Sequence, residues 1–183
     1  TDGEVAVVFN STRGRLHGDL RVGVDLAAAV PMRANGLVAN RGVQLLAPGF
    51  SLSEDELARL EDARPLARPL RNGKDLTDRP RGVSVIDTYG LALDQLRKQH
   101  PSTFQWLLDR AKPAREVNTR DSYRELWWQF GENQPAMRAA LKGLDRYIAT
   151  AITARHRIFV FLPGGTMPDQ AVLAIGLGDA YFV

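Results

Sequence analysis

Three strand-like runs occupy the C-terminal part of the sequence, and the segments between them are short. The runs cover residues 146–152, 157–162 and 171–177 and are rich in β-branched and aromatic residues. Parallel neighbours need a connection of about a dozen residues or more, whereas antiparallel neighbours are joined by short loops. The spacing therefore predicts a small antiparallel meander, in which each strand pairs with the next.

Short helices are predicted upstream of these strands. Ser53 stands as an N-cap three residues before Glu56, and Leu52 and Leu57 are spaced to pack across the first turn, so a helix is expected over residues 54–62. Further helices are expected at 91–98, 104–111 and 135–142. Short helices packed on a small antiparallel sheet make the predicted fold class α+β.

Two local signals refine these boundaries. Ser102 and Gln105 have the spacing of a second capping box, and Pro113 is expected to end the helix that follows.

Residues 63–81 contain three prolines and the pair Asn72-Gly73, so this stretch is predicted to be extended or turning, with exposed arginines. Residues 82–87 alternate like a strand.

The N-terminal part carries weaker signals. Residues 5–9, VAVVF, form a β-branched run typical of a strand covered on both faces. Residues 10–48 are punctuated by glycine, with short apolar pieces at 24–30 and 43–46. Loops and short strands are expected there.

The charge is unevenly distributed. Residues 63–160 carry 18 basic and 10 acidic side chains, whereas residues 1–62 carry 6 and 9. The chain has 20 Arg and only 4 Lys, and the planar guanidinium matches phosphates and guanine edges. A nucleic-acid partner is one hypothesis. The alternative is that a GC-rich genome favours arginine, and that the basic block only solvates the surface.

Most catalytic chemistry is excluded. The absence of cysteine removes disulfides, thiol nucleophiles and Cys-based zinc sites. His17, His100 and His156 are far apart and none lies in an HExxH motif, so no metal site is expected. The sequence has no Pro-Pro dipeptide of the kind found in amino-methyltransferase loops, no phosphate loop and no nuclease motif. We therefore expect no catalytic residues and no cofactor in this chain.

No membrane segment is expected either. No apolar run approaches the roughly 18 residues that a membrane helix needs. The N-terminus has no charged region followed by an apolar stretch and a cleavage site. These observations predict a soluble, cytoplasmic protein.

Two groups of residues remain as candidates for function. Residues 123–130, YRELWWQF, place four aromatic side chains around one arginine. They could stack on bases, but adjacent tryptophans in a small domain more often anchor the core. In the second group, residues 146–157, polar donors lie on two expected strands and their connection. A solvated strand rim is the alternative interpretation there.

Several motifs closely resemble the region that follows the catalytic domain in large MmeI-like restriction-modification proteins, which are DNA adenine-N6 methyltransferases. They are RPLRNGKDL (68–76), YRELWWQF (123–130), RYIAT (146–150), RHRIFVFL (155–162) and Pro168-Asp169. Their order and spacing match over residues 64–183, and residues 20–60 look like the connecting part of the same proteins.

The resemblance implies a target recognition domain that binds double-stranded DNA and selects the sequence to be methylated. Residues 1–62 would be a connector from the methyltransferase domain of the same parent chain, with 5–9 as its last strand, and residues 63–183 the recognition domain. Residues 179–183, DAYFV, would open a helix that continues in the parent. S-adenosylmethionine would serve the parent and would not bind this chain, and the target adenine would be flipped out of the duplex.

On this interpretation, the DNA-binding residues fall into two sets. Arg68, Arg71 and Lys74 are expected to contact phosphates and set the register. Base edges are expected to be read by Thr153, Arg155, His156, Asp169 and Gln170, with Arg146 and Arg157 as further DNA contacts. The alternative from another class is a non-catalytic protein-interaction or structural module with a solvated basic surface.

Overall fold

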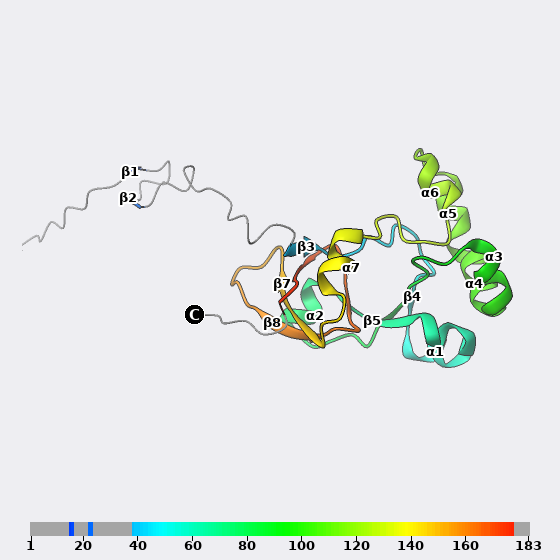
Figure 1. The fold of residues 1–183 in the computed structure, drawn as a ribbon, viewed down its shortest axis with the longest axis horizontal. Helices are drawn as coiled ribbons and strands as arrows, with labels where there is room; N and C mark the ends of the chain where they lie inside the picture. Colours follow the sequence, from blue (N-terminus) through cyan, green and yellow to red (C-terminus); the bar gives the residue numbers. More distant parts are fainter. Residues whose placement is uncertain (1–14, 17–21, 24–37, 178–183) are drawn as a thin grey trace, which may run out of the picture. The chain divides into compact units, whose positions relative to one another are not determined.

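The computed structural model describes residues 15–16, 22–23 and 38–177 (Figure 1). The chain divides into two compact units, residues 1–36 and 37–183. In the first unit, β1 (Arg15–Leu16) and β2 (Val22–Gly23) pair antiparallel. The predicted strand at 5–9, the apolar piece at 24–30 and the predicted helix start at 179–183 lie outside the described residues.

Two four-stranded sheets form the framework of the second unit. The first sheet is antiparallel throughout and has the strand order β3 (Ala39–Arg41), β10 (Val172–Ile175), β7 (Arg146–Ala151) and β8 (Val160–Pro163). The second sheet has the order β4 (Ser51–Leu52), β6 (Ser84–Ile86), β5 (Ala67–Arg71) and β9 (Met167–Pro168). Within this second sheet, the β5–β9 pair is parallel and the other two pairs are antiparallel.

The three C-terminal strands are present and antiparallel, as predicted, but they do not form a meander. β7 lies between β10 and β8, so the last strand pairs with the first of the three and not with its predecessor. The reason lies in the connection after β8. Its residues Met167 and Pro168 form β9 in the second sheet, and the chain then returns on the other side of β7.

Several short helices accompany the two sheets, which confirms the α+β fold class. They are α1 (Glu54–Arg59), a 3₁₀ helix (Glu61–Leu66), α2 (Gly73–Thr77), α3 (Leu93–Gln99), α4 (Pro101–Arg110), α5 (Lys112–Glu116), α6 (Asp121–Glu125) and α7 (Pro135–Leu141). α2 packs against β5 and β7, and α7 packs against β3 and β10. α3 and α4 lie side by side (Figure 1). Within the described residues, no helix is long and apolar enough to cross a membrane.

One of the two predicted capping boxes is correct. Ser53 accepts a hydrogen bond from the Glu56 backbone, and the Glu56 carboxylate accepts one from the Ser53 backbone. The predicted box at Ser102 is wrong, because α4 already begins at Pro101. The Asp62 carboxylate caps this helix instead, accepting hydrogen bonds from the backbone of Ser102 (2.7 Å) and Thr103 (3.1 Å). A carboxylate from a distant segment has taken the place of the local cap.

Residues 63–81 are more regular than predicted. The extended part is β5, but the predicted Asn72-Gly73 turn is wrong, since Asn72 is the N-cap of α2. The Asn72 side chain accepts from the Asp75 backbone at 3.0 Å, and the Asp75 carboxylate accepts from the Asn72 backbone at 2.8 Å. This capping box, which the sequence analysis did not predict, begins a helix of only five residues.

The two adjacent tryptophans belong to the core, as expected. Trp127 and Trp128 are 7% and 9% exposed and meet edge to face at 6.1 Å, an arrangement that favours aromatic pairs. The Trp128 indole donates to the Leu91 carbonyl at 3.0 Å. Phe104 extends the stack at 5.9 Å from Trp127. These aromatic residues join α3, α4 and the segment after α6 into one core.

Candidate functional site

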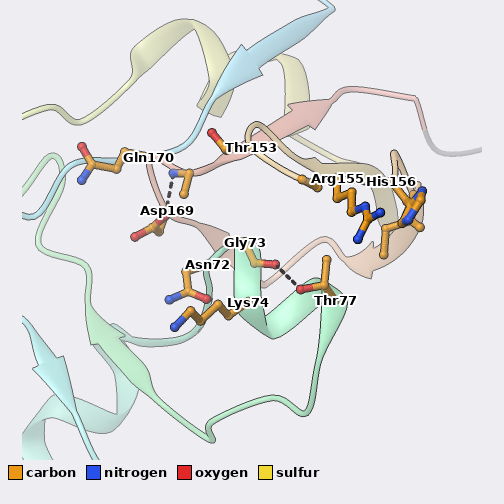
Figure 2. A pocket seen from close by; sticks show the side chains of 12 residues that line it. Asn72, Gly73, Lys74, Thr77, Thr153, Arg155, His156, Asp169 and Gln170 are labelled. Atoms are coloured by element: carbon orange, nitrogen blue, oxygen red, sulfur yellow. Dashed lines mark hydrogen bonds between the residues drawn. The ribbon is translucent and has the colours of Figure 1, made fainter.

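A hollow of about 610 Å³ lies beside α2 and is shown in Figure 2. Three segments far apart in the sequence line it: residues 72–77 at α2, residues 153–158 between β7 and β8, and residues 169–171 between β9 and β10. We call it the α2 hollow. Its lining residues are Asn72, Gly73, Lys74, Thr77, Thr153, Ala154, Arg155, His156, Ile158, Asp169, Gln170 and Ala171.

The α2 hollow brings together most of the residues predicted to contact DNA. Those that line it are Lys74, Thr153, Arg155, His156, Asp169 and Gln170. They include the whole set expected to read base edges, together with one of the three residues expected to hold phosphates. In Figure 2, Arg155 and His156 lie across the hollow from Asp169 and Gln170, with α2 along a third side.

The other four predicted residues lie outside this lining. Arg68 pairs with Asp87, with 3.1 Å between Nε and the carboxylate. Arg71 donates to the neighbouring Leu70 carbonyl at 3.0 Å. Arg146 stacks on the Phe161 ring with its guanidinium carbon 4.3 Å from the centroid. Arg157 donates to the Ala151 carbonyl at 2.9 Å, which ties the connection that carries Arg155 to the end of β7.

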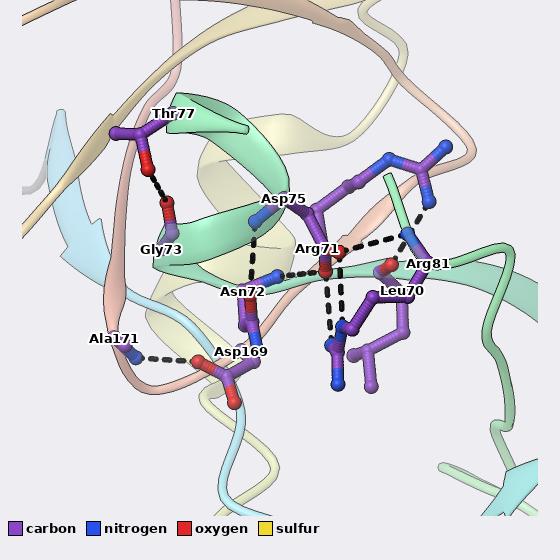
Figure 3. Close-up of polar contacts among 9 residues, drawn as sticks. All are labelled: Leu70, Arg71, Asn72, Gly73, Asp75, Thr77, Arg81, Asp169 and Ala171. Atoms are coloured by element: carbon purple, nitrogen blue, oxygen red, sulfur yellow. Dashed lines mark hydrogen bonds and ion pairs between the residues drawn. The ribbon is translucent and has the colours of Figure 1, made fainter. Parts of the chain in front are cut away.

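A buried carboxylate holds α2 in place (Figure 3). Asp75 accepts hydrogen bonds from the Arg81 backbone at 3.0 Å and from two nitrogens of the Arg81 guanidinium, both at 2.9 Å, in addition to its bond to Asn72. Burial by itself would raise the pKa of Asp75, but the hydrogen bonds from Arg81 and Asn72 outweigh it and lower the pKa to about 2. Asp75 is therefore charged at neutral pH and fixes the helix that presents Lys74.

The parallel β5–β9 pair fixes the wall of the hollow that residues 169–171 form. Leu70 lies opposite Met167, and the Asp169 backbone donates to the Arg71 carbonyl at 2.9 Å. The Asp169 carboxylate accepts from the Ala171 backbone at 2.6 Å, which closes the turn that carries Gln170 (Figures 2 and 3). This acid therefore shapes the wall as well as lining it.

Glycine is required where β3 leads into this wall. A Cβ on Gly42 would lie 2.2 Å from the Pro168 carbonyl oxygen, much closer than any real contact of this kind. The following residue, Val43, donates to the same carbonyl at 2.9 Å. The first sheet can approach β9 this closely only because position 42 lacks a side chain.

Two cations, Lys74 and Arg155, and one carboxylate, Asp169, line the α2 hollow. Within the described part of the chain, neither Lys74 nor Arg155 forms an ion pair, and both side chains are exposed. Nearby, Arg41 directs two guanidinium nitrogens at the Gln170 carbonyl, at 3.3 and 3.4 Å, and also pairs with no described acid. Unpaired cations around a hollow attract anions.

Sequence reasoning missed several parts of this site. Asn72, Gly73 and Thr77 line the hollow beside Lys74, and Asp75 with Arg81 supports them from behind. A usable signal was present, because an asparagine followed three residues later by an aspartate has the spacing of a capping box. Arg41 carried no such signal, since its closeness to Gln170 depends on the pairing of β3 with β10.

Metal chemistry finds no support in the same region. Among the described residues, no group of three or more His, Asp or Glu side chains could hold a metal ion. What the hollow offers is hydrogen-bond donors, acceptors and positive charge.

The fold is similar to that of a protein solved in complex with DNA. The chain aligns with the type IIL restriction-modification enzyme MmeI, whose structure was determined in complex with DNA, at a TM-score of 0.63 and 12% sequence identity. The alignment covers 85% of this chain and 21% of the enzyme, so the chain spans about a fifth of the enzyme's length. No family model and no curated protein matches the sequence. At this identity the likeness establishes a related fold.

Proposed function

We propose that the protein binds duplex DNA through the α2 hollow, as the target recognition domain of a site-specific adenine-N6 DNA methyltransferase of the restriction-modification type. The observation that carries the proposal is the unneutralised charge. Lys74 and Arg155 come from segments about eighty residues apart, yet line one hollow without an acid partner in the described structure. A polyanion would supply the missing charge.

The lining residues divide into two roles. Lys74 contacts a phosphate, together with Arg68 and Arg71 on the strand that leads to it, and these contacts set the register without reading sequence. Arg155, with Thr153, His156 and Gln170, has the donors and acceptors that base edges in the major groove require. Arg146 at the start of β7 and Arg157 in the connection between β7 and β8 add positive charge.

The remaining roles of Asp169 follow from its position. A carboxylate beside a phosphate would be repelled, so next to DNA its place is against the amino group of cytosine or adenine. Its hydrogen bond to the Ala171 backbone holds it still enough to serve as an acceptor of this kind.

Catalysis belongs to another part of the proposed longer protein. There, a methyltransferase domain would hold S-adenosylmethionine and receive the flipped adenine, while this domain holds the flanking bases. The similarity in fold to a fifth of a restriction-modification enzyme solved with DNA supports this division. A thermal-shift measurement with S-adenosylmethionine should show no stabilisation of the present chain.

Lysine substitutions test DNA binding with matched charge changes. We expect the protein to bind a mixed-sequence duplex at roughly micromolar affinity or weaker at physiological salt. Lys74→Gln should weaken binding and flatten the dependence of log K on log salt by about one unit. Lys98→Gln is the control, because Lys98 lies on α3, away from the hollow, and is equally exposed to solvent.

The result separates DNA binding from the alternative. An equal, small effect of both substitutions would mean that only net charge matters, as in a protein-interaction module with a solvated basic surface. No retention on heparin or mixed DNA beyond what the net charge of +3 predicts would contradict the proposal directly.

A further inference from the structure

A second hollow, of about 290 Å³, lies beside α7. We call it the α7 hollow. Three cations line it: Arg68 from β5, Arg138 from α7 and Lys142 from the C-cap of α7. Tyr89 and Pro168 complete the part of the lining that matters here.

The buried carboxylate of Asp87 pairs with two of these three cations. Asp87 accepts two hydrogen bonds from the Arg138 guanidinium, at 2.8 and 2.9 Å, and approaches Arg68 Nε at 3.1 Å. Lys142 forms no ion pair in the described structure. Three positive charges against one negative charge leave two unbalanced at the α7 hollow.

Arg138 is held by several contacts, and Arg68 by one. Arg138 Nε also donates to the Asn133 carbonyl at 2.7 Å, and its guanidinium carbon lies 4.4 Å from the Tyr89 ring centroid. Because Asp87 is occupied by both nitrogens of Arg138 and by Arg68 Nε, the terminal nitrogens of Arg68 remain for another acceptor. A preorganised guanidinium beside a free lysine is suited to a phosphate group.

The β5–β9 pair connects this hollow to the α2 hollow. Arg68 and Pro168 line the α7 hollow, whereas Asn72 and Asp169, slightly further along the same two segments, line the α2 hollow. Arg68 and Asn72 are four residues apart, which at the rise of a strand is about 13 Å. The major groove of DNA is about 12 Å wide, so one duplex is large enough to meet both hollows.

We propose that the α7 hollow is a second phosphate-binding site. It holds the DNA backbone at one edge of the major groove, the groove whose base edges face the α2 hollow. This inference rests on the proposed DNA binding and adds to it a place where the duplex is clamped. It also explains how Arg68 can contact DNA, because Arg68 lines the α7 hollow and not the α2 hollow.

The four lysines of the chain provide the test. Lys74 lines the α2 hollow, Lys142 lines the α7 hollow, Lys98 lines neither, and Lys112 is paired with Glu116. In each Lys→Gln variant the same charge is lost. We expect Lys142→Gln to weaken binding to a mixed-sequence duplex by roughly 3- to 10-fold near 0.1 M salt and to flatten the salt slope by about one unit, as for Lys74→Gln. Lys98→Gln and Lys112→Gln should leave both quantities nearly unchanged.

A second measurement does not depend on substitutions. Acetylation of the wild-type protein, followed by mass spectrometry, should show that DNA protects Lys74 and Lys142 but not Lys98. If Lys74 responds in both measurements and Lys142 in neither, DNA binding stands and the second site is wrong. If neither lysine responds, the proposed function fails as well.

Discussion

The helical region from Pro101 to Glu132 and the sheet region around the α2 hollow are both rich in arginine, but they treat their charges differently. In the helical region, Arg120 pairs with Glu132, Arg124 pairs with Asp121, and Arg110 lies over the Trp106 ring at 3.5 Å. Around the α2 hollow, Lys74 and Arg155 have no such partners among the described residues. The basic block of the sequence therefore contains two populations, one paired or stacked within the fold and one without ion-pair partners among the described residues.

Arg115 is the extreme member of the first population. It is fully buried and donates to the carbonyls of Leu45 (2.7 Å) and Gln129 (2.9 Å), and it forms no ion pair with any described acid. Burial lowers its pKa, while the Tyr123 ring lies 5.4 Å from the guanidinium carbon. An arginine count alone assigns such a residue to the surface, and the structure places it in the core.

The largest expected effect tests the structural role of the helical region. Trp128→Ala should cost about 3 to 5 kcal/mol in the free energy of unfolding, because it removes a buried indole and leaves a cavity. Urea denaturation measures this, with the half-exposed Tyr89→Ala as the control that should cost much less. If Trp128→Ala keeps its stability and loses DNA affinity instead, the helical region is a binding surface and the comparison fails.

Asp75 tests whether the sheet region also contains residues that act only through stability. Its depressed pKa means that the carboxylate contributes fully above about pH 4 and loses its contribution as the pH falls toward 2. The difference from its ordinary pKa is worth about 2 kcal/mol at neutral pH. Asp75→Asn should therefore destabilise the protein at pH 7, and the gap from wild type should narrow below pH 4.

The control for this prediction is Asp145→Asn, since Asp145 is exposed and forms no ion pair in the described structure. Its substitution should change the unfolding free energy little at any pH. A gap between wild type and Asp75→Asn that stays constant from pH 7 to pH 2 would show that the hydrogen-bond geometry matters and the charge does not.

Arg155 is expected to show the opposite behaviour, with binding affected and stability unchanged. If its guanidinium reads a guanine, its loss costs about 1 to 3 kcal/mol of discrimination at one position of the recognised sequence. In the proposed longer methyltransferase, Arg155→Gln should relax one position of the methylated motif and leave non-specific affinity nearly unchanged. Sequencing of genomic methylation measures this. An unchanged motif with a uniform drop in methylation would make Arg155 a phosphate or scaffold residue.

The smallest expected effect is that of a neutralised arginine. Arg124 forms an exposed pair with Asp121, and such pairs contribute less than about 1 kcal/mol. Arg124→Gln should therefore change neither the melting temperature nor the affinity for mixed-sequence DNA by a measurable amount. A loss of affinity as large as that of Lys74→Gln would remove the distinction between the two populations of arginine.

Local signals in the sequence predicted local structure well. The cap formed by Ser53 and Glu56, the helices near 91–98 and 135–142 and the three C-terminal strands depend on neighbouring residues, and all are present. Features that depend on distant partners were missed or wrong. The cap of α4 comes from Asp62, and β9 is a two-residue strand whose existence depends on β5.

The same contrast between local signals and distant partners holds for the candidate site. The sequence selects Lys74, Thr153, Arg155, His156, Asp169 and Gln170, and the structure brings these six residues into one hollow. The chain gave no sign that Arg68 would line a different hollow, because its pairing with Asp87 and its closeness to α7 are tertiary. Whether these residues bind DNA, and which of them read bases, stays a prediction.

The β5–β9 pair also determines when the α2 hollow can exist. It joins Leu70 to Met167, nearly a hundred residues apart, and loop closure over such a length makes this kind of contact slow to form during folding. On the ribosome, the residues of α2 are synthesised first, those of the 153–158 segment about eighty residues later, and the lining of the hollow is complete only when Ala171 has been added. A nascent chain therefore carries Lys74 long before it has the other residues of the hollow.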